Sequence, residues 1–410
     1  MIVKTGMKWS SAIATETDTD AALDVAIGKI EAQLQGEKPD VVFLFVSPQH
    51  RVNYARAGAA VVKRLNPGHM LGCSGGAVIG EGREIEHKAA LSITAAVLPG
   101  VTITPFRLDD DALPGLDDAP GRWEEAIGVH ASDDPQFVIV ADPFSMSRAE
   151  DMLRGFDYAF PKSAKIGGLA SGASGPGQNA LYLDHAFRRS GAVGLAFSGE
   201  LELDTLVAQG CRPIGKPMRI TRCQKNLLIE LDKRPAIHLL AELFEGADER
   251  EQDLIRTSLF LGIVMDPFKA GEPQAGDFLI RNVMGMDAQR GVLGIGALLD
   301  EGQTVQFHLR EANAATSDLD AVLRRYSTER MNAMKGESLP PPPRGALLFS
   351  CLGRGEGLYG KPDHDSLAFA SKFVDAPLGG FFCNGEIGPV GGTTYLHGFT
   401  SCFGIFRNKD

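Results

Sequence analysis

A repeated order of elements is the feature that most constrains how this chain folds: a buried strand, a helix, a short strand and then a glycine-rich loop. In the first copy the strand begins at Val41 and the loop at Gly72, 31 residues later. In the second copy Phe137 and Gly167 take these places, 30 residues apart, and the two loops are offset by about 95 residues. Because such an offset usually marks a repeated structural unit, we predict an internal duplication.

A third, looser copy follows near the end of the chain. Its first strand, at 346–351, begins 33 residues before a second strand at Gly379, and the loop Asn384-Gly385-Glu386 comes next. Short apolar runs separated by helical patterns indicate buried strands that alternate with helices. We therefore expect an α/β fold in which repeated strand–helix–strand units form mixed, layered sheets, with helices on the outer faces and two domains.

The division into domains rests on a break in the pattern after the second copy. Pro213 and Pro217 fall just before a new strand that begins at Leu227, and prolines commonly mark connections between elements. The predicted domains are residues 1–220, with repeats at about 38–110 and 134–210, and residues 221–410.

Local turn signals predict one strand pairing. Residues 90–97 and 101–106 have the composition of strands, and Pro99-Gly100 between them is a typical turn sequence. We therefore expect these two strands to form a hairpin.

Composition excludes several classes of protein. Glycine makes up 48 of 410 residues without a collagen-like period, and 44% hydrophobic residues are too many for a disordered chain. The net charge of −11 argues against a nucleic-acid partner, which would need a basic face. No run approaches the roughly 18 apolar residues that cross a membrane, and no secretory signal is visible, so we expect a cytoplasmic protein without a membrane partner.

The six cysteines and nine histidines show no metal-binding spacing. No Cys-x-x-Cys pair is present, which excludes a zinc ribbon or a thioredoxin-type motif. His364 lies between Asp363 and Asp365, but acidic residues are expected at the start of a helix. We therefore expect no bound metal, and we interpret most of the cysteines as small buried hydrophobic residues.

The glycine loops hold the candidate binding residues. Cys73, Ser74, Gly75 and Gly76 end the first short strand, and Ser171 lies in the second loop. Successive backbone N–H groups without large side chains form a nest that can hold a carboxylate or a phosphate. The alternative is a tight turn that needs glycine only for its backbone conformation.

Charges among the glycines of the third copy give the sharper prediction. Arg354 can bind a carboxylate through two hydrogen bonds, and Glu386 can accept hydrogen bonds from an ammonium group. Together they would satisfy an amino-acid zwitterion, although an internal Arg–Glu ion pair is an equal alternative. Further candidates for the same crevice are Cys351, Glu356, Asn384, His397 and Thr400.

These residues also carry a resemblance to a known family. Leu71–Gly76 and the following Gly80–His87 resemble the FIST N-terminal domain. Phe349–Gly355, Gly380–Ile387 and Leu396–Thr400 are similar to motifs of the FIST C-terminal domain. The resemblance extends from about Ser10 to Arg407, with the motifs in order.

The resemblance implies a sensory module that binds small ligands, amino acids being the usual suggestion. FIST pairs occur fused to bacterial signalling domains and to an F-box in eukaryotes, and some bacterial members are described as haem-binding nitric-oxide sensors. Nearly all of this chain corresponds to the two FIST halves, so the resemblance implies that a separate signalling protein carries the output.

The leading hypothesis is a cytoplasmic protein that holds an amino acid, or a similar small carboxylate or zwitterion, between its FIST N-like and C-like halves. One alternative is a thiol-dependent enzyme that uses Cys73 or Cys351, although no complete catalytic constellation is visible. Another is a haem-binding gas sensor, with His87, His185 or His397 as the ligand to iron. The sequence leaves open whether the protein forms homo-oligomers.

Overall fold

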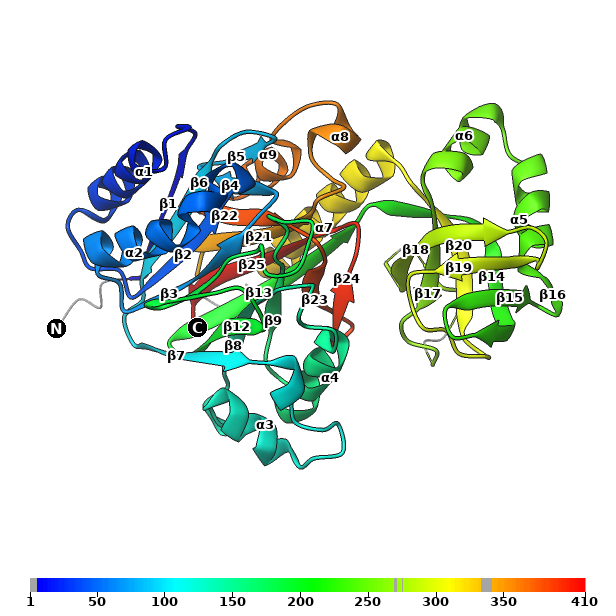
Figure 1. Cartoon of the computed structure of the whole chain (residues 1–410), viewed down its shortest axis with the longest axis horizontal. Coiled ribbons are helices and arrows are strands. Elements are labelled where there is room, and N and C mark those ends of the chain that lie inside the picture. Colours follow the sequence, from blue (N-terminus) through cyan, green and yellow to red (C-terminus); the bar gives the residue numbers. More distant parts are fainter. Residues whose placement is uncertain (1–5, 269–270, 275, 333–340, 410) are drawn as a thin grey trace. The chain divides into compact units, whose positions relative to one another are not determined.

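The structure is a computed structural model that describes residues 6–268, 271–274, 276–332 and 341–409. The chain forms two compact units (Figure 1). Unit 1 consists of Met1–Val207, Asp320–Leu396 and Thr400–Asp410, and unit 2 consists of Ala208–Leu319 and His397–Phe399. Unit 1 thus combines residues from both sides of the boundary predicted after residue 220, which itself falls within strand β14 (Cys211–Gln224).

Unit 1 contains three six-stranded sheets that share one order of strands. The first sheet runs β1 (Lys8–Ala14), β6 (Leu91–Val97), β2 (Val41–Val46), β3 (His69–Ser74), β10 (Leu181–Leu183), β11 (Ala186–Arg188). The second runs β7 (Val101–Leu108), β12 (Ala192–Gly199), β8 (Gln136–Ala141), β9 (Lys165–Leu169), β23 (Glu386–Val390), β24 (Thr393–His397). The third runs β13 (Leu201–Gln209), β25 (Thr400–Asn408), β21 (Gly345–Cys351), β22 (Leu378–Cys383), β4 (Ala77–Gly80), β5 (Arg83–Glu86).

The shared order confirms the predicted repeated units and the mixed α/β class. In each sheet the third and fourth strands are parallel, as in β2 with β3, β8 with β9, and β21 with β22. The first repeat runs from β1 to β6 and the second from β7 to β12, so both begin one strand and one helix earlier than the sequence pattern indicated. The third begins with β13, resumes after the strands of unit 2 and ends with β25.

Each repeat gives a hairpin to the sheet of another repeat. The hairpin β4–β5 of the first repeat pairs with β22 of the third. The hairpin β10–β11 of the second repeat pairs with β3 of the first, and β23 of the third repeat pairs with β9 of the second. The exchange is therefore cyclic, and every sheet is completed by strands from a different part of the sequence.

The predicted hairpin around Pro99-Gly100 is wrong. A turn is present there, since Val101 N donates to Leu98 O, but β6 lies in the first sheet and β7 in the second. The composition of a turn does not determine which strands pair. Here β6 and β7 each pair with strands of their own repeat, and the turn only carries the chain from one sheet to the next.

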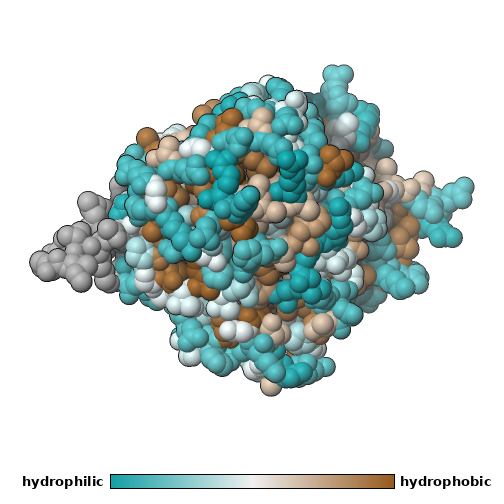
Figure 2. Space-filling view, turned by 60° about the vertical axis from the view of Figure 1, so that its left-hand side comes forward, coloured by the Kyte–Doolittle hydropathy of each residue, from teal (hydrophilic) through white to brown (hydrophobic). Residues whose placement is uncertain are grey.

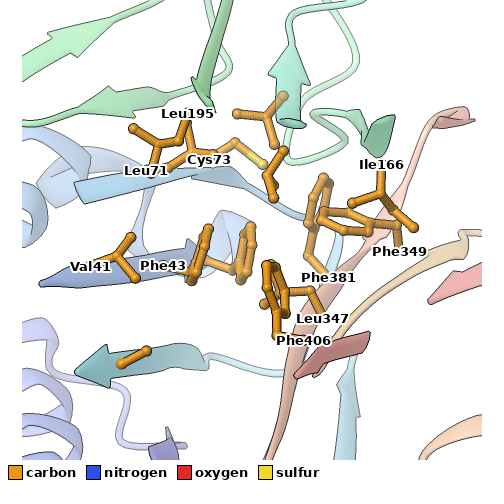
Figure 3. Packing of buried hydrophobic residues seen from close by; sticks show 14 of the residues in the cluster. Val41, Phe43, Leu71, Cys73, Ile166, Leu195, Leu347, Phe349, Phe381 and Phe406 are labelled. Carbon is orange, nitrogen blue, oxygen red and sulfur yellow. The ribbon is translucent and has the colours of Figure 1, made fainter. Parts of the chain in front are cut away.

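The inner faces of the three sheets share one hydrophobic core. Phe43 comes from the first sheet, Ile166 from the second, and Phe349 and Phe381 from the third, and all are buried (Figure 3). The rings of Phe349 and Phe381 meet edge to face with centroids 5.7 Å apart. Side chains of a strand alternate between its faces, so in β2 the odd-numbered residues enter this core and the even-numbered ones pack outward.

Helices cover the outer faces of these sheets. The first sheet packs against α1 (Thr19–Leu34) and α2 (Tyr54–Leu65), and the second against α3 (Pro120–Ile127) and α4 (Ala149–Ala159). The third repeat contains α7 (Ala312–Asn332), α8 (Glu356–Tyr359) and α9 (His364–Ala370), and Phe369 of α9 stacks on Phe403 of β25. Figure 2 shows hydrophilic side chains over much of one face of the molecule, with smaller hydrophobic patches between them.

Unit 2 contains a seven-stranded sheet, two whole helices and the first residues of α7. Its strands run in the order β14, β20 (Thr304–Arg310), β17 (Leu259–Val264), β18 (Phe278–Asp287), β19 (Val292–Ile295), β15 (Leu227–Leu231) and β16 (Arg234–Pro235). The helices α5 (Ala236–Glu245) and α6 (Glu249–Thr257) pack on its core. Within the described residues of both units, no helix has the length and apolar character needed to cross a membrane.

One glycine in each repeat lets the two parallel strands lie together. A Cβ at Gly72, Gly167 or Gly380 would lie 1.9, 1.7 or 1.9 Å from the carbonyl oxygen of its partner on the neighbouring strand. No side chain fits at these distances, because the obstacle is backbone and not a movable side chain. Gly72 and Gly167, 95 residues apart, therefore occupy equivalent positions in the first two repeats, and both positions require glycine for the same reason.

Substitution of this glycine tests the requirement. We expect Gly167→Ala to lower the free energy of unfolding by about 3 kcal/mol or more, because the added methyl group forces the parallel strands apart. Gly28→Ala is the matched control, because nothing lies within 4 Å of that position in α1 and alanine favours a helix over glycine. Denaturant unfolding measures both, and equal stability of the two variants would contradict the proposed role.

Candidate functional site

The glycine loops of all three repeats meet at one side chain, Ser171. Its hydroxyl accepts a hydrogen bond from Gly76 N at 2.8 Å and donates to Phe382 O. Gly76 follows β3, Ser171 follows β9, and Phe382 lies at the end of β22. The structure thus brings together Gly76 and Ser171, which the sequence singled out on separate copies, and uses the serine to hold the loops in contact.

The loop after β3 uses its backbone N–H groups within the protein. Ser74 N donates to Ala180 O, and Gly75 N donates to Val46 O, both at 3.0 Å. With Gly76 N bound to Ser171, the three successive donors of the predicted anion nest already have partners. The loop is therefore a junction between segments, and an anion would have to displace one of these bonds.

Ser74 fixes both ends of the loop 172–178, which is partly exposed. Its carbonyl oxygen accepts hydrogen bonds from Ser171 N and Gly172 N, at 3.1 and 3.2 Å. Its hydroxyl accepts from Ala180 N at 2.9 Å and donates to Asn179 Oδ1 at 3.0 Å. A single buried residue thus closes this glycine-rich loop, which explains a serine at this position without reference to catalysis.

Arg354 is completely buried and forms an ion pair with Asp365. Its Nε donates to Asp365 Oδ2 at 2.8 Å and its Nη2 to Oδ1 at 3.1 Å, in a two-bond fork. The remaining nitrogen, Nη1, is buried and has no hydrogen-bond partner. The partner of Arg354 is therefore Asp365, which the sequence analysis interpreted only as a helix cap.

A polar shell surrounds the carboxylate of Asp365. His364 Nδ1 lies 2.9 Å from Oδ1, and the hydroxyls of Ser350 and Ser401 donate to Oδ2. Burial alone would raise the pKa of Asp365, but the Arg354 guanidinium and these donors hold it well below its ordinary value. Burial likewise opposes the charge of Arg354, and Asp365 raises the pKa of Arg354 above its ordinary value. Both groups are therefore charged in the folded protein.

Glu386, the second ionisable residue that the sequence singled out, is also buried. Its Oε2 accepts hydrogen bonds from Thr400 N and Thr400 Oγ1, at 3.2 and 2.9 Å, and its Oε1 has no hydrogen-bond partner of ordinary geometry. Burial raises the pKa of Glu386 to about 8, against the lowering effects of Thr400, the Arg354 charge and the weak donor thiol of Cys351. Arg354 and Glu386 thus influence each other, and each retains one polar atom without a partner.

A further buried carboxyl, Glu84, was missed by the sequence analysis. It lies on β5, the hairpin that the first repeat gives to the third sheet, and its Oε1 accepts from Ser366 N and Ser366 Oγ at 2.7 and 2.9 Å. Burial and the nearby Asp365 charge raise the pKa of Glu84 to about 8. In the sequence, Glu84 stands out only because it belongs to the Gly80–His87 motif. That motif does not show that Glu84 is buried next to residues of the third repeat.

The other predicted residues occupy different environments. Glu356 is exposed, and its backbone N–H donates to Glu86 Oε1 at 2.8 Å. Asn384 is exposed and its N–H donates to Leu169 O, whereas Thr400 contacts Glu386 directly. Among the histidines considered as haem ligands, His87 follows β5, His185 lies in the turn between β10 and β11, and His397 is buried at the end of β24.

Three buried cysteines lie in the core beneath these loops. Burial raises the pKa of the Cys73, Cys383 and Cys402 thiols above the ordinary value. A nucleophilic cysteine requires the opposite shift, because the thiolate is the reactive form. Cys73 therefore has the environment of a structural thiol, while Cys351 is partly exposed and lies next to Glu386.

Together these features define a repeat-built α/β protein with a buried charged site beneath converging glycine loops. The chain belongs to the FIST family: residues 40–234 match the FIST N domain and residues 236–389 match the FIST C domain. FIST domains are small-ligand sensory domains. The family assignment confirms the resemblance found in the sequence.

The chain is also similar to other proteins, two of them over nearly its whole length. An uncharacterized protein of Mycobacterium tuberculosis is 32% identical over 414 residues, covering 98% of this chain and 100% of that protein. An uncharacterized protein of Mycobacterium bovis is 32% identical over 400 residues, covering 98% and 99%. An F-box/LRR-repeat protein of Arabidopsis thaliana is 34% identical over 113 residues, covering 27% of this chain and 20% of that protein.

Two solved structures, both of cyanuric acid hydrolases, align with nearly the whole chain. One, from A. caulinodans, has a TM-score of 0.35 at 7% identity and covers 98% of this chain and 100% of its own. The other has a TM-score of 0.31 at 9% identity, with the same coverage.

Removal of the Asp365 charge tests the ion pair. We expect Asp365→Asn to lower the free energy of unfolding by about 3–5 kcal/mol, because it leaves the buried Arg354 charge uncompensated. The exposed pair Arg122–Glu125 is the matched control, and Arg122→Gln should change stability by less than about 1 kcal/mol. Denaturant unfolding measures both variants. If they lose similar amounts of unfolding free energy, Asp365 does not compensate a buried Arg354 charge.

The raised pKa of Glu386 predicts a pH dependence of stability. Between the ordinary value of 4.5 and about 8, the unfolded chain has lost this proton while the folded protein retains it. Stability therefore falls as pH rises through this window, by up to about 1.4 kcal/mol per pH unit for this group. Glu386→Gln should remove that contribution, so the difference in unfolding free energy between variant and wild type grows from pH 5 to pH 8. A difference that stays constant with pH would show that Glu386 is ionised throughout.

Proposed function

We propose that this protein is a sensor for a small zwitterionic ligand, an amino acid or a close analogue, bound beneath the converging loops of unit 1. The observation that carries the proposal is the pair of unpartnered atoms, Arg354 Nη1 and Glu386 Oε1, one on a buried guanidinium and the other on a buried carboxyl group that a bound ammonium group would favour in its ionised form. Buried polar atoms are normally satisfied, and exceptions call for an explanation such as a bound group. A ligand that carries both a carboxylate and an ammonium group satisfies both.

The ion pair with Asp365 prepares Arg354 for this role. The fork to Asp365 uses Nε and Nη2, which fixes the plane of the guanidinium and leaves Nη1 as the donor for a carboxylate. Thr400 fixes Glu386 in the same way and leaves Oε1 as the acceptor for an ammonium group. Groups that are held in place before binding lose little conformational entropy when a ligand arrives.

The loops that converge on Ser171 come from both family domains. Gly76 and Ser171 belong to the FIST N segment, and Phe382 and Glu386 to the FIST C segment, yet all four lie within unit 1. This arrangement supports a ligand held between the N-like and C-like halves. A ligand that joined these loops would affect all three repeats at once.

Access requires the segment 351–360 to move. Arg354 has 1% of its surface exposed and Glu386 none, whereas Leu352 is 44% exposed and packs over Gly76. The segment contains four glycines, which allow its backbone more than one conformation. We propose that binding shifts the balance between open and closed forms of this segment, and that a separate partner protein detects the closed form.

Calorimetric titration tests the ligand class. We expect at least one of glycine, L-alanine, L-glutamate and L-lysine to bind, while acetate and propylamine, which each carry one of the two charged groups, bind at least about tenfold more weakly. Glu386→Gln keeps the bond to Thr400 but replaces the free acceptor, and Arg354→Lys keeps the charge beside Asp365 but loses the free donor. Each of these two substitutions should lower the affinity for the amino acid by about tenfold or more.

Glu125→Gln, on an exposed residue of α3, serves as the control and should bind as the wild type does. Thermal unfolding establishes that each variant is folded before titration. The proposal is wrong if none of the amino acids binds, or if both variants bind with wild-type affinity.

A further inference from the structure

Two cysteines lie side by side at the ends of neighbouring strands of the third sheet. Cys351 is the last residue of β21 and Cys383 the last residue of β22, and the two are paired in register in the parallel ladder. Neighbouring strands of a sheet lie about 4.8 Å apart, and the Cα atoms of a disulfide are usually about 4.4–6.8 Å apart. The backbone therefore places these two residues at a separation that a disulfide spans.

Both cysteine side chains lie on the same face of the sheet. The preceding pair in the same register is Phe349 with Phe381, whose rings meet in the central core. Side chains alternate along a strand, so Cys351 and Cys383, two residues further along, point to the same side as these rings. Cys383 accordingly belongs to the same core cluster. The two thiols are therefore neighbours on one side of the sheet.

Of the two thiols, Cys351 is the one that reagents in solution reach first. It is partly exposed, at the start of the glycine-rich segment 351–360, whereas Cys383 is completely buried. Burial raises the pKa of the Cys383 thiol well above its ordinary value, so this thiol is uncharged at neutral pH. The pair thus combines an outer sulfur that can meet an oxidant with an inner sulfur that can react with the product.

The surroundings of Cys351 favour reaction at its sulfur. Gly353 N donates to Cys351 Sγ at 3.4 Å, and nearby N–H donors and positive charges stabilise a thiolate. Burial lowers the pKa of Arg354, while Asp365 and, to a lesser extent, Cys351 raise it, so the guanidinium and the sulfur are close enough to interact. The thiol is also the weak donor to Glu386 described above, which places a carboxyl group where it can accept the proton.

From this pairing we infer that Cys351 and Cys383 form a reversible disulfide when the protein meets hydrogen peroxide. The Cys351 sulfur attacks one peroxide oxygen and the O–O bond breaks. The departing hydroxide takes up the thiol proton as water, and Cys351 becomes a sulfenic acid. The Cys383 sulfur then displaces the sulfenic hydroxyl, which leaves as a second water with the Cys383 proton, and the S–S bond forms. Two thiols have then lost two electrons, and one peroxide has been reduced to two waters.

Peptide mapping after oxidation tests the pairing. Reduced protein at about pH 8, where thiolates form more readily, is treated with hydrogen peroxide, which catalase then removes. The remaining thiols are blocked with N-ethylmaleimide in denaturant. We expect the tryptic peptides 345–354 and 373–407 to be joined, and to separate after dithiothreitol, which reduces disulfides by exchange. If these peptides are never joined, the inference is wrong.

Variants identify the inner sulfur, because peptide 373–407 contains both Cys383 and Cys402. Cys383→Ser should abolish the joined peptides and trap the sulfenic acid of Cys351, with at least about tenfold more dimedone adduct there than in the wild type. Cys402→Ser is the matched control, since Cys402 is also buried but pairs in register with Phe349, and it should still give the joined peptides. Loss of the bond in Cys402→Ser and its survival in Cys383→Ser would overturn the assignment.

Cys223 is an internal control for exposure in every sample. It is partly exposed, like Cys351, but its neighbour in the ladder is Leu228, so it should remain unlinked. A bond to Cys223 that forms as readily would show that register does not select the pair. Thermal unfolding confirms that each variant is folded, and Cys383→Ala provides a second variant without the inner thiol. The measurement needs no amino-acid ligand, so its outcome is independent of the proposed function.

Discussion

The structure depends on an exchange of hairpins among three repeats. A parallel pair such as β2 and β3 leaves the backbone of β3 without partners on one side, and the hairpin that follows β3 pairs with another sheet. The edge of β3 is instead paired by β10 from the second repeat. Because each repeat both gives and receives a hairpin, the links after β3, β9 and β22 cross from one sheet to another, and each of them contains glycine.

The same constraint explains what could be predicted from the sequence. The repeat was visible because each copy needs a glycine at one position of its second parallel strand, where the carbonyl oxygen of the neighbouring strand excludes a side chain. The hairpin exchange was not visible, since no local pattern reveals which distant edge a hairpin joins. Pro99-Gly100 likewise has the composition of a hairpin turn although it joins two sheets, and no local pattern relates Asp365 or Glu84 to Arg354. The sequence identified Arg354 and Glu386 themselves because charges among glycines and apolar strands are rare enough to stand out.

The buried charges work against the stability of the fold. An ion pair such as Arg354–Asp365 gives up the hydration of both partners, and packed apolar residues in the same place are often as stable or more stable. Two carboxyls with a pKa of about 8 add to this cost at neutral pH and above. A protein that only needed a stable core would have no use for these groups, so their presence agrees with a site whose specificity depends on charge.

The hairpin exchange also determines the order in which the chain is completed. The second repeat spans residues 101–199, but the strand that pairs with the open edge of β9 is β23, at residues 386–390. During synthesis, almost the entire chain leaves the ribosome before that edge has its partner. The same holds for β13, whose neighbour β25 contains the last strand residues of the chain. Strand edges of the earlier repeats therefore remain unpaired until β23 and β25 have been synthesised and can pair with the second and third sheets. Unpaired strand edges promote association with other chains.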